Sequence, residues 1–222
     1  MIREGNIVAD VGTDHGYSAI YLVKGHICQR AIALDVRTGP LARASEHIVQ
    51  NGLEDSIETR LSDGLDAVEP GEADCMIAAG MGGPLMIHIL ENGADVVAEM
   101  KECILQPQSE IAGVRKYLWE NGFAIEEEHM VLEEGKFYPM MRAVPGKRQD
   151  IPEELFELYA QYGQLLLQQK DQVLGLFLDK ELKSREKLLE RLEQKPGMNK
   201  ERLEQLAAEK CMLEQAVWMI RE

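Results

Sequence analysis

Residues 7–17, IVADVGTDHGY, decide the fold of this 222-residue chain. Residues 7–11 form a short apolar run with the β-branched content of a strand that is buried on both faces. Asp10 interrupts this run, and a carboxylate near the end of a core strand is costly unless a partner occupies it. Gly12 allows a tight turn, and a helix is expected from about Gly16. This order of strand, acid, glycine and helix is typical of a nucleotide-like ligand site at the carboxyl edge of an open α/β sheet.

The turn after the strand distinguishes between two classes of ligand. A dinucleotide site has the pattern G-x-G-x-x-G, but residues 12–16 read GTDHG, with Asp14 in place of the second glycine. A carboxylate there would repel a pyrophosphate and attract a cation, which favours a ligand with an ammonium or sulfonium group, namely S-adenosyl-L-methionine. A P-loop is excluded because no Gly-Lys-Ser/Thr occurs. The alternative is an ordinary turn with a solvated Asp14.

The composition suits one well-packed core with a smaller appendage, since 45% of the residues are hydrophobic. The chain has neither a run of about 18 apolar residues nor a signal-peptide layout, so we expect a cytoplasmic protein without a membrane segment. The cysteines are isolated from one another and from histidine pairs, which indicates neither a metal site nor a disulfide framework. They are Cys28, Cys75, Cys103 and Cys211.

The net charge of −15 argues against broad, non-specific binding of polyanions. Residues 1–150 hold 13 Lys and Arg against 25 Asp and Glu, whereas residues 151–222 hold 11 against 14. Contacts to a nucleic acid would therefore depend on local basic clusters. The candidate clusters are Arg37 with Arg43, Arg115 with Lys116, and Arg142 with Lys147 and Arg148.

Two further strands end in acids that could bind a nucleoside. The strand predicted at residues 31–36 ends at Asp35, which is 25 residues after Asp10 and suits the two ribose hydroxyls. The alternative interpretation is that Asp35 is a surface acid at the end of a strand, without a role in binding. The strand at residues 57–61 is followed by Ser62-Asp63-Gly64, and Asp63 could accept a hydrogen bond from the exocyclic amine of an adenine. The alternative there is a plain turn, because Asp-Gly is a common turn pair.

A glycine-rich segment follows the strand predicted at residues 74–79. It reads Gly80-Met81-Gly82-Gly83-Pro84, and its glycines indicate either a tight bend or a flat group lying against bare backbone. A base to be methylated would enter at this point. The next strand, at residues 103–106, leads into Gln106-Pro107-Gln108-Ser109.

The remaining pattern of residues 1–150 predicts alternating helices and a final hairpin. Helices are expected at residues 17–24, 37–51 and 110–121, and another begins at Leu85. The last two strands, at residues 123–132 and 137–144, are joined through residues 133–136 as a hairpin. Seven strands with the last two antiparallel match the sheet of class I methyltransferases.

Residues 151–222 carry no strand signal and are predicted to form a separate helical domain. Gly163 and Gly175 are the weak points of the first helical stretch, and residues 196–199 form a turn before a helix to about Ile220. Leu182, Leu189 and Leu192 would face Leu203, Leu206, Met212 or Leu213, and Val217 in an antiparallel helical hairpin. A stabilising role, a dimerisation role and an arm without a binding role all remain open, as do a monomer and a homodimer.

Several motifs together resemble the bacterial TrmK family, tRNA methyltransferases that modify N1 of adenine 22. They are VADVGTDHGY, AIALDVRTGP, RLSDGLDAV, AAGMGG, LQPQ and EEGKFY, and they span nearly the whole chain. The resemblance implies a Rossmann-like, class I methyltransferase domain with a mostly parallel seven-stranded sheet, a C-terminal coiled-coil domain, S-adenosyl-L-methionine as donor and tRNA as substrate. A methyltransferase for a small molecule or a protein, and a non-catalytic donor-binding module, are the rival functions.

The resemblance also implies the site residues. Asp35 would take the ribose and Asp63 the adenine end of the donor. The residues expected in the donor site are Asp10, Gly12, Thr13, Asp14, His15, Tyr17, Asp35, Val36, Asp63, Gly64, Gly80, Met81 and Gly82, and the catalytic candidates are Asp63, Asp14 and Tyr17.

The chain departs from the family and from related enzymes in two ways. Members usually carry a helix ahead of the first strand, so by comparison this chain looks shortened at its N-terminus. The segment at residues 80–84 lacks the Asn/Asp-Pro-Pro-Tyr of enzymes that methylate exocyclic amines, which fits a ring nitrogen as the target. Because N1 lies on the pairing edge, the base must be unpaired, and Tyr17, Met81 and Tyr138 are candidates to hold it.

Overall fold

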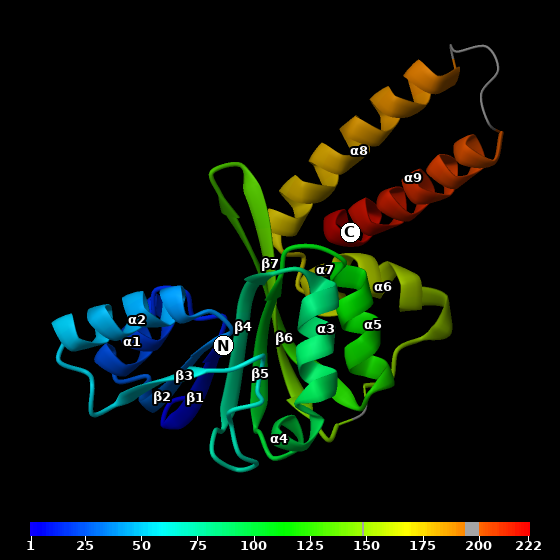
Figure 1. The fold of residues 1–222 in the computed structure, drawn as a ribbon. Helices are drawn as coiled ribbons and strands as arrows, with labels where there is room; N and C mark the ends of the chain where they lie inside the picture. The colour runs from blue at the N-terminus through cyan, green and yellow to red at the C-terminus, as the bar shows by residue number, and fades with distance from the viewer. Residues whose placement is uncertain (148, 194–199) are drawn as a thin grey trace. The chain divides into compact units, whose positions relative to one another are not determined.

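The computed structural model describes residues 1–147, 149–193 and 200–222 (Figure 1). The chain divides into two compact units. The first comprises residues 1–127 and 139–150, and the second comprises residues 128–138 and 151–222. Within the described ranges, every helix is too short or too polar to cross a membrane.

A seven-stranded sheet with the order β3-β2-β1-β4-β5-β7-β6 is the framework of the fold. The strands are β1 (Asn6–Val11), β2 (Cys28–Asp35), β3 (Ile57–Leu61), β4 (Cys75–Met81), β5 (Glu102–Pro107), β6 (Phe123–Glu133) and β7 (Lys136–Pro145). Strands β3, β2, β1, β4 and β5 run parallel, and β7 pairs antiparallel with β5. The prediction of a mostly parallel, Rossmann-like sheet with seven strands is confirmed.

Local sequence explains why the strands form where they do. The middle residues of β1, β2 and β4 are almost wholly buried and apolar, as expected for parallel strands that are covered on both faces. The β6–β7 hairpin turns at Glu134 and Gly135, whose φ angles of 49° and 77° are both positive. A two-residue turn with this geometry matches the right-handed twist of the strands it joins.

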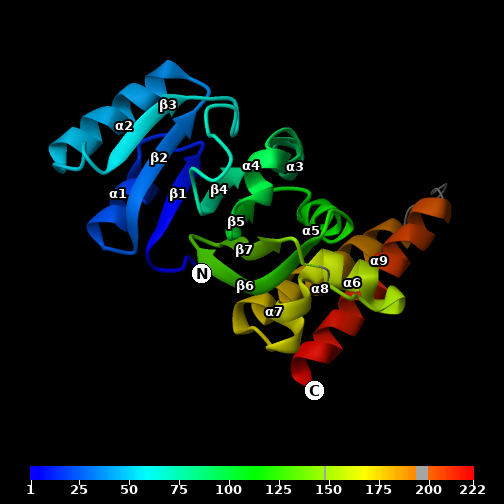
Figure 2. The same ribbon diagram turned by 90° about the horizontal axis from the view of Figure 1, so that it is seen from below.

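Helices cover both faces of the sheet in the first unit (Figure 2). They are α1 (Tyr17–Lys24), α2 (Thr38–Gln50), α3 (Gly83–Asn92), α4 (Ala94–Ala98) and α5 (Ile111–Glu120). Helices α1 and α2 contact β1, β2 and β3, whereas α3 contacts β4 and packs on α5. Strand β1 therefore lies where the strand order reverses, and crevices at such a point bind ligands in open α/β sheets.

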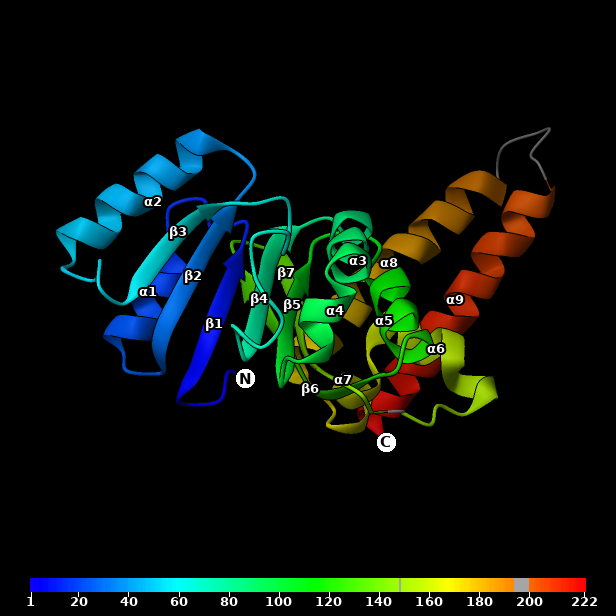
Figure 3. The same ribbon diagram turned by 60° about the horizontal axis from the view of Figure 1, so that its bottom comes forward.

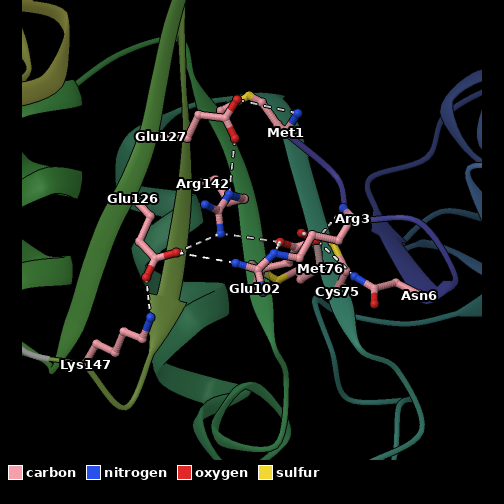
Figure 4. Close-up of polar contacts among 10 residues, drawn as sticks. All are labelled: Met1, Arg3, Asn6, Cys75, Met76, Glu102, Glu126, Glu127, Arg142 and Lys147. Carbon is pink, nitrogen blue, oxygen red and sulfur yellow. Dashed lines mark hydrogen bonds and ion pairs between the residues drawn. The ribbon is translucent and has the colours of Figure 1, made fainter.

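A buried ionic network joins the start of the chain to β5, β6 and β7 (Figure 4). Its centre is Glu102, whose side chain is 0% exposed. Oε1 of Glu102 accepts hydrogen bonds from Arg3 N and Asn6 Nδ2, both at 2.9 Å, and Oε2 lies 3.6 Å from Nη1 of Arg142. Glu126 and Glu127 also pair with Arg142, at 3.1 and 3.2 Å. The network lies at the amino ends of the parallel strands, where it fixes the first residue of β1.

The second unit contains two long helices that lie side by side (Figures 1 and 3). Its helices are η1 (Glu153–Leu155), α6 (Phe156–Tyr162), α7 (Gln164–Gln168), α8 (Gln172–Glu193) and α9 (Lys200–Arg221). Asp179 pairs with Arg221 at 2.8 Å and Arg185 pairs with Glu209 at 2.6 Å, so α8 and α9 run antiparallel. The turn predicted at residues 196–199 lies outside the described residues.

The two glycines predicted as weak points differ in their effect. Gly163 separates α6 from α7, with φ 91° and ψ 121°. Gly175 lies inside α8, where a β-carbon would be 3.5 Å from Cγ2 of Ile220. A β-carbon there would make an ordinary van der Waals contact, so the packing against α9 does not require a glycine, and Gly175 does not break the helix.

Candidate active site

A cleft of about 420 Å³ opens at the carboxyl ends of β1, β2, β3 and β4 in the first unit. Its walls come from four strand ends and from the start of α3. The lining residues are Val11, Gly12, Asp14, Asp35, Val36, Arg37, Ser62, Asp63, Gly64, Ala79, Gly80, Met81, Leu85 and Ile89. The structure thus brings together eight of the residues predicted for the donor site: Gly12, Asp14, Asp35, Val36, Asp63, Gly64, Gly80 and Met81.

Asp10 is buried behind the cleft and does not line it. Its Oδ2 accepts a hydrogen bond from Oγ1 of Thr13 at 2.7 Å, and the backbone N–H of Ala19 also bonds to it. Burial raises the pKa of Asp10, and these two hydrogen bonds act against that rise. The buried carboxylate of Asp10 therefore has its hydrogen-bond partners within the protein and does not need a ligand to supply them. Asp10 joins the end of β1 to the turn and to the first residues of α1.

Gly12 brings the first turn close to the loop after β4. Its φ is +76°, and its N–H donates to the carbonyl of Leu34 at 2.8 Å. A β-carbon at this position would lie 3.3 Å from Cε of Met81. A side chain at residue 12 would therefore be strained by the backbone and would narrow the cleft against Met81.

Asp14 lies at the rim of the cleft and has a cationic neighbour. Its φ is +48°, and its side chain is 56% exposed. Arg43 donates to Oδ1 at 3.1 Å, and Nε2 of His15 lies 3.5 Å from Oδ2. The carboxylate predicted to face a cationic ligand is therefore already partly neutralised by α2.

His15 and Tyr17 lie outside the cleft. They form a cluster of nearly parallel rings with His47 of α2, in which the ring centroids are 5.2–5.6 Å apart. Tyr17 lines a separate, mostly apolar groove together with Tyr21 and Ile77. The cluster joins the first turn to α2, and the structure places neither side chain among the cleft residues.

Asp35 presents a carboxylate at the end of β2 and is only 6% exposed. Its Oδ1 accepts the N–H of Arg37 at 2.8 Å, and Nε of Arg37 lies 3.7 Å from the same atom. Within the described residues, no hydrogen bond to the second oxygen is found. That oxygen is thus available to a hydroxyl donor in the cleft.

Asp63 is positioned by an ion-pair clamp that sequence patterns did not reveal. Arg60, in β3, donates to both carboxylate oxygens of Glu72, at 2.8 and 2.5 Å, and to the carbonyl of Ala67 at 2.8 Å. This pairing lowers the pKa of Glu72 to about 2. Ser62 adds a hydrogen bond to the carbonyl of Gly64 at 3.0 Å. The loop that carries Asp63 is therefore held at both ends.

The end of β5 holds the glycine-rich end of β4. The register between β4 and β5 shifts between Ala79 and Met81, so that Gly80 forms a bulge with φ +77°. The N–H of Gly80 donates to Oε1 of Gln106 at 2.9 Å, which satisfies a group that the bulge would leave unpaired. Gln106 is a second positioning residue, and the sequence pattern does not predict its role although it lies in the LQPQ motif.

Gly82 and Gly83 serve packing between the segments that follow β4 and β5. A β-carbon at Gly83 would lie 2.5 Å from the carbonyl oxygen of Ser109, and one at Gly82 would lie 3.1 Å from Oγ of Ser109. Gly82 does not line the cleft. Of the glycines in this segment, only Gly80 faces the cleft with bare backbone.

The structure overturns part of the predicted phosphate-binding clusters. Arg115 is 1% exposed and Arg142 is 9% exposed, so neither side chain can contact an RNA backbone, and those predictions are wrong. Lys147 pairs with Glu126 and Arg43 with Asp14. Arg148 lies outside the described residues. Arg37, with a 72% exposed side chain at the rim of the cleft, is the best placed member of the predicted set.

The chemistry of the cleft suits an adenosyl donor with a positive charge. Three carboxylates and one guanidinium line it, and Asp35 and Asp63 are spaced along two strand ends for a nucleoside. A pyrophosphate would meet net negative charge here. In the described part of the chain, no three His, Cys, Asp or Glu side chains gather closely enough to hold a metal ion.

Comparison with known proteins gives one family. The family model of TrmK, described as tRNA (adenine(22)-N(1))-methyltransferase, matches residues 8–217. The tRNA (adenine(22)-N(1))-methyltransferase of Bacillus subtilis is 33% identical over 220 residues, which cover 97% of this chain and 92% of that protein.

Solved structures agree with the sequence comparison. The crystal structure of the B. subtilis m1A22 tRNA methyltransferase TrmK is 31% identical and has a TM-score of 0.85, covering 97% of this chain and 94% of that one. A Streptococcus pneumoniae protein in complex with S-adenosyl-L-methionine is 28% identical, with a TM-score of 0.86 over 98% of this chain and 94% of that one. The chain therefore belongs to the TrmK family of tRNA (adenine(22)-N(1))-methyltransferases, whose methyl donor is S-adenosyl-L-methionine.

Proposed function

We propose that the cleft at the ends of β1–β4 binds S-adenosyl-L-methionine and that methyl transfer to N1 of adenine 22 in tRNA takes place at its mouth. The observation that carries this proposal is the convergence of Asp14, Asp35 and Asp63 from three successive strand ends on one cleft. These acids are far apart in the sequence, and a packing role would not bring them to one concave surface.

Each acid has a distinct role toward the donor. The free oxygen of Asp35 accepts hydrogen bonds from the ribose hydroxyls, and Asp63, beside Gly64, accepts one from the exocyclic amine of the adenine. Asp14 lies nearest to the charged end of the donor, and Arg43 limits its negative charge. Asp10 and Thr13 act behind the cleft as positioning residues.

The reaction needs alignment more than it needs a strong base. When bound, S-adenosyl-L-methionine supplies a methyl group on a sulfonium ion, which bonds to N1 while the electrons of the broken C–S bond stay on sulfur. Neutral adenine has a lone pair on N1, so the chain's own task is to hold that atom in line with the methyl group. The product ring is cationic, and the carboxylate of Asp14, at the charged end of the donor, stabilises the charge that develops.

Helix α8 offers a basic surface for tRNA. Lys180, Lys183, Lys187 and Arg191 are exposed and follow one another at intervals of three and four residues, so they form one stripe along the helix. The spacing of these cations can be read from the sequence. The overall charge of residues 151–222 does not reveal it, because acids outnumber bases there. We assign the stripe to contacts with the phosphate backbone.

We further propose that residues 1–150, apart from residues 128–138 at the tip of the β6–β7 hairpin, form the methyltransferase domain. Residues 128–138 belong to the second compact unit, in which residues 151–222 form a helical domain with α8 and α9 packed as an antiparallel coiled coil. The cross-helix ion pairs and the buried Leu206 and Leu213 support that packing.

Transfer of labelled methyl groups to unmodified bacterial tRNA, followed by mapping of the label, tests the proposed function. Label at N1 of adenine 22 is expected. Asp63→Ala should weaken donor binding about 10- to 100-fold, as is typical for loss of a hydrogen bond to a charged group. Asp66→Ala, an exposed acid of the same loop, is the matched control and should bind the donor within about twofold of wild type. Full methylation by the Asp63→Ala variant would remove Asp63 from the mechanism.

A further inference from the structure

The loop after β5 carries a glutamine that the proposed reaction does not use. Gln108 is exposed, and within the described residues its side-chain amide makes no hydrogen bond to the protein. Nε2 of Gln108 lies 3.8 Å from the position that a β-carbon on Gly80 would occupy. Gly80 lines the cleft and has no side chain, so no side chain at residue 80 separates the amide of Gln108 from the cleft.

The backbone of Gln108 is fixed relative to the cleft. Its N–H donates to the carbonyl of Met81 at 2.9 Å, and on the next residue the carbonyl of Ser109 accepts the N–H of Gly83 at 3.1 Å. On the other side, Gln106 is held by the N–H of Gly80. The backbone on both sides of Gln108 is thus hydrogen-bonded to the end of β4 and the start of α3, and its carboxamide lies beside Gly80, which lines the cleft, although Gln108 itself does not.

A carboxamide matches one edge of adenine. Its N–H can donate to N7 while its oxygen accepts from the N6 amino group, and glutamine makes this bidentate pair with adenine in protein–DNA complexes. This pairing leaves N1 free, on the opposite side of the amino group. Guanine does not fit, since O6 and N7 are both acceptors and N1 carries a hydrogen.

We propose that Gln108 binds the N6 and N7 edge of the target adenine and so presents N1 toward the donor. The inference rests on the proposed function and adds the residue that selects adenine. As N1 gains a methyl group, positive charge spreads onto N6. The hydrogen bond from N6 to Oε1 of Gln108 then becomes charge-assisted, so Gln108 binds the transition state better than the substrate.

Atomic substitution of the substrate tests the contact. Wild type, Gln108→Ala and the control Gln50→Ala are assayed on tRNA with adenosine, 7-deazaadenosine or guanosine at position 22. Gln50 is an exposed glutamine at the far end of α2. Donor binding is measured for each variant by calorimetry.

On adenosine, Gln108→Ala should lower kcat/KM about 10- to 100-fold, with part of the loss in kcat. Replacing N7 by carbon should lower kcat/KM of wild type and of Gln50→Ala about fivefold, the effect of one hydrogen bond. The same replacement should leave Gln108→Ala within about twofold, because the donor to N7 is already gone. Donor affinity should be unchanged in all variants.

Two results would overturn the inference. One is that Gln108→Ala methylates adenosine-22 tRNA as fast as wild type. The other is that the N7 substitution slows Gln108→Ala as much as it slows wild type. Either result is distinct from a failure of the proposed function, which would appear as no methylation of adenosine 22 by the wild-type protein.

Discussion

Arg60 shows how one side chain can position a residue that it does not contact, here Asp63 in the cleft. Its guanidinium bonds to both oxygens of Glu72 and to Glu58, and it lowers the pKa values of these two acids. The segment between Glu58 and Glu72 carries Asp63, so the geometry of this cleft residue depends on residues that do not line the cleft. A bidentate pair of this kind has better geometry than a typical surface ion pair.

The pH dependence of stability should reveal this clamp. The pKa of Glu72 is lowered from 4.5 to about 2 in the folded protein, so the folded state binds its proton less readily than the unfolded state does. The stabilisation is present above about pH 4.5 and is lost as the pH falls toward about 2. Because solvent screens the pair, we expect a contribution of about 1–2 kcal/mol.

Urea unfolding between pH 5 and pH 2.5 measures this contribution. Glu72→Gln should be less stable than wild type at pH 5, and the difference should shrink as the pH falls. Glu69→Gln, an exposed acid of the same loop, is the control. A constant difference between Glu72→Gln and wild type across this range would contradict the assignment.

Strands β5 and β7 depend on the buried network at the amino edge of the sheet. Arg142, on β7, lies between Glu102, Glu126 and Glu127. Replacing a buried partner with an apolar side chain leaves the remaining charges uncompensated. We therefore expect Arg142→Met to lower the free energy of unfolding by about 3 kcal/mol.

The midpoint of urea unfolding at pH 7 tests that expectation. Arg30→Met provides the control, because Arg30 is exposed on β2. Its effect should stay within about 0.5 kcal/mol. If both variants unfold at the same urea concentration, the network does not stabilise the sheet.

Helix α8 should contribute to tRNA binding through its basic stripe. The triple variant Lys183→Ala, Lys187→Ala and Arg191→Ala should weaken tRNA binding and reduce the slope of log affinity against log salt by about 2–3. Donor affinity should not change. In the control, removal of the neighbouring acids by Glu186→Ala and Glu190→Ala should leave tRNA binding unchanged or tighter. An unaltered salt slope in the triple variant would exclude the stripe from the interface.

At the scale of the whole molecule, a net charge of −15 has to be reconciled with an anionic substrate. The acids of the cleft favour a cationic donor and product, and we expect the exposed cations of α8 and Arg37 to supply local attraction. On this proposal, affinity for tRNA depends on a few contacts against a repulsive background. Such binding is sensitive to salt.

Raising the salt concentration separates the two ligands. With about four phosphate contacts, tRNA affinity should fall about 100-fold between about 50 and 200 mM salt. Affinity for S-adenosyl-L-methionine should change far less, because its contacts are short-range hydrogen bonds in a cleft. Filter binding and calorimetry over the same salt series provide the two measurements. A flat response of tRNA binding would argue against tRNA as the substrate.

The seven strands, the final hairpin and the placement of Asp35 and Asp63 at strand ends were determined by the sequence itself. Burial of a strand and the conformation of a turn depend on residues that are neighbours in the chain, so a local pattern is enough to predict them. Parallel strands also bring their carboxyl ends to one edge of the sheet. That rule places acids from distant segments near one another.

Only the tertiary structure decided which polar groups pair with one another. Asp10 bonds to Thr13 and Ala19 behind the cleft, and Arg142 is enclosed by acids. His15 and Tyr17 pack against α2 and do not enter the cleft. Many of these pairings join residues that are far apart in the sequence and that only the fold brings together. Composition and spacing along the chain therefore do not predict them. A buried arginine and an exposed one look alike in a sequence, because their difference is the desolvation imposed by the rest of the fold.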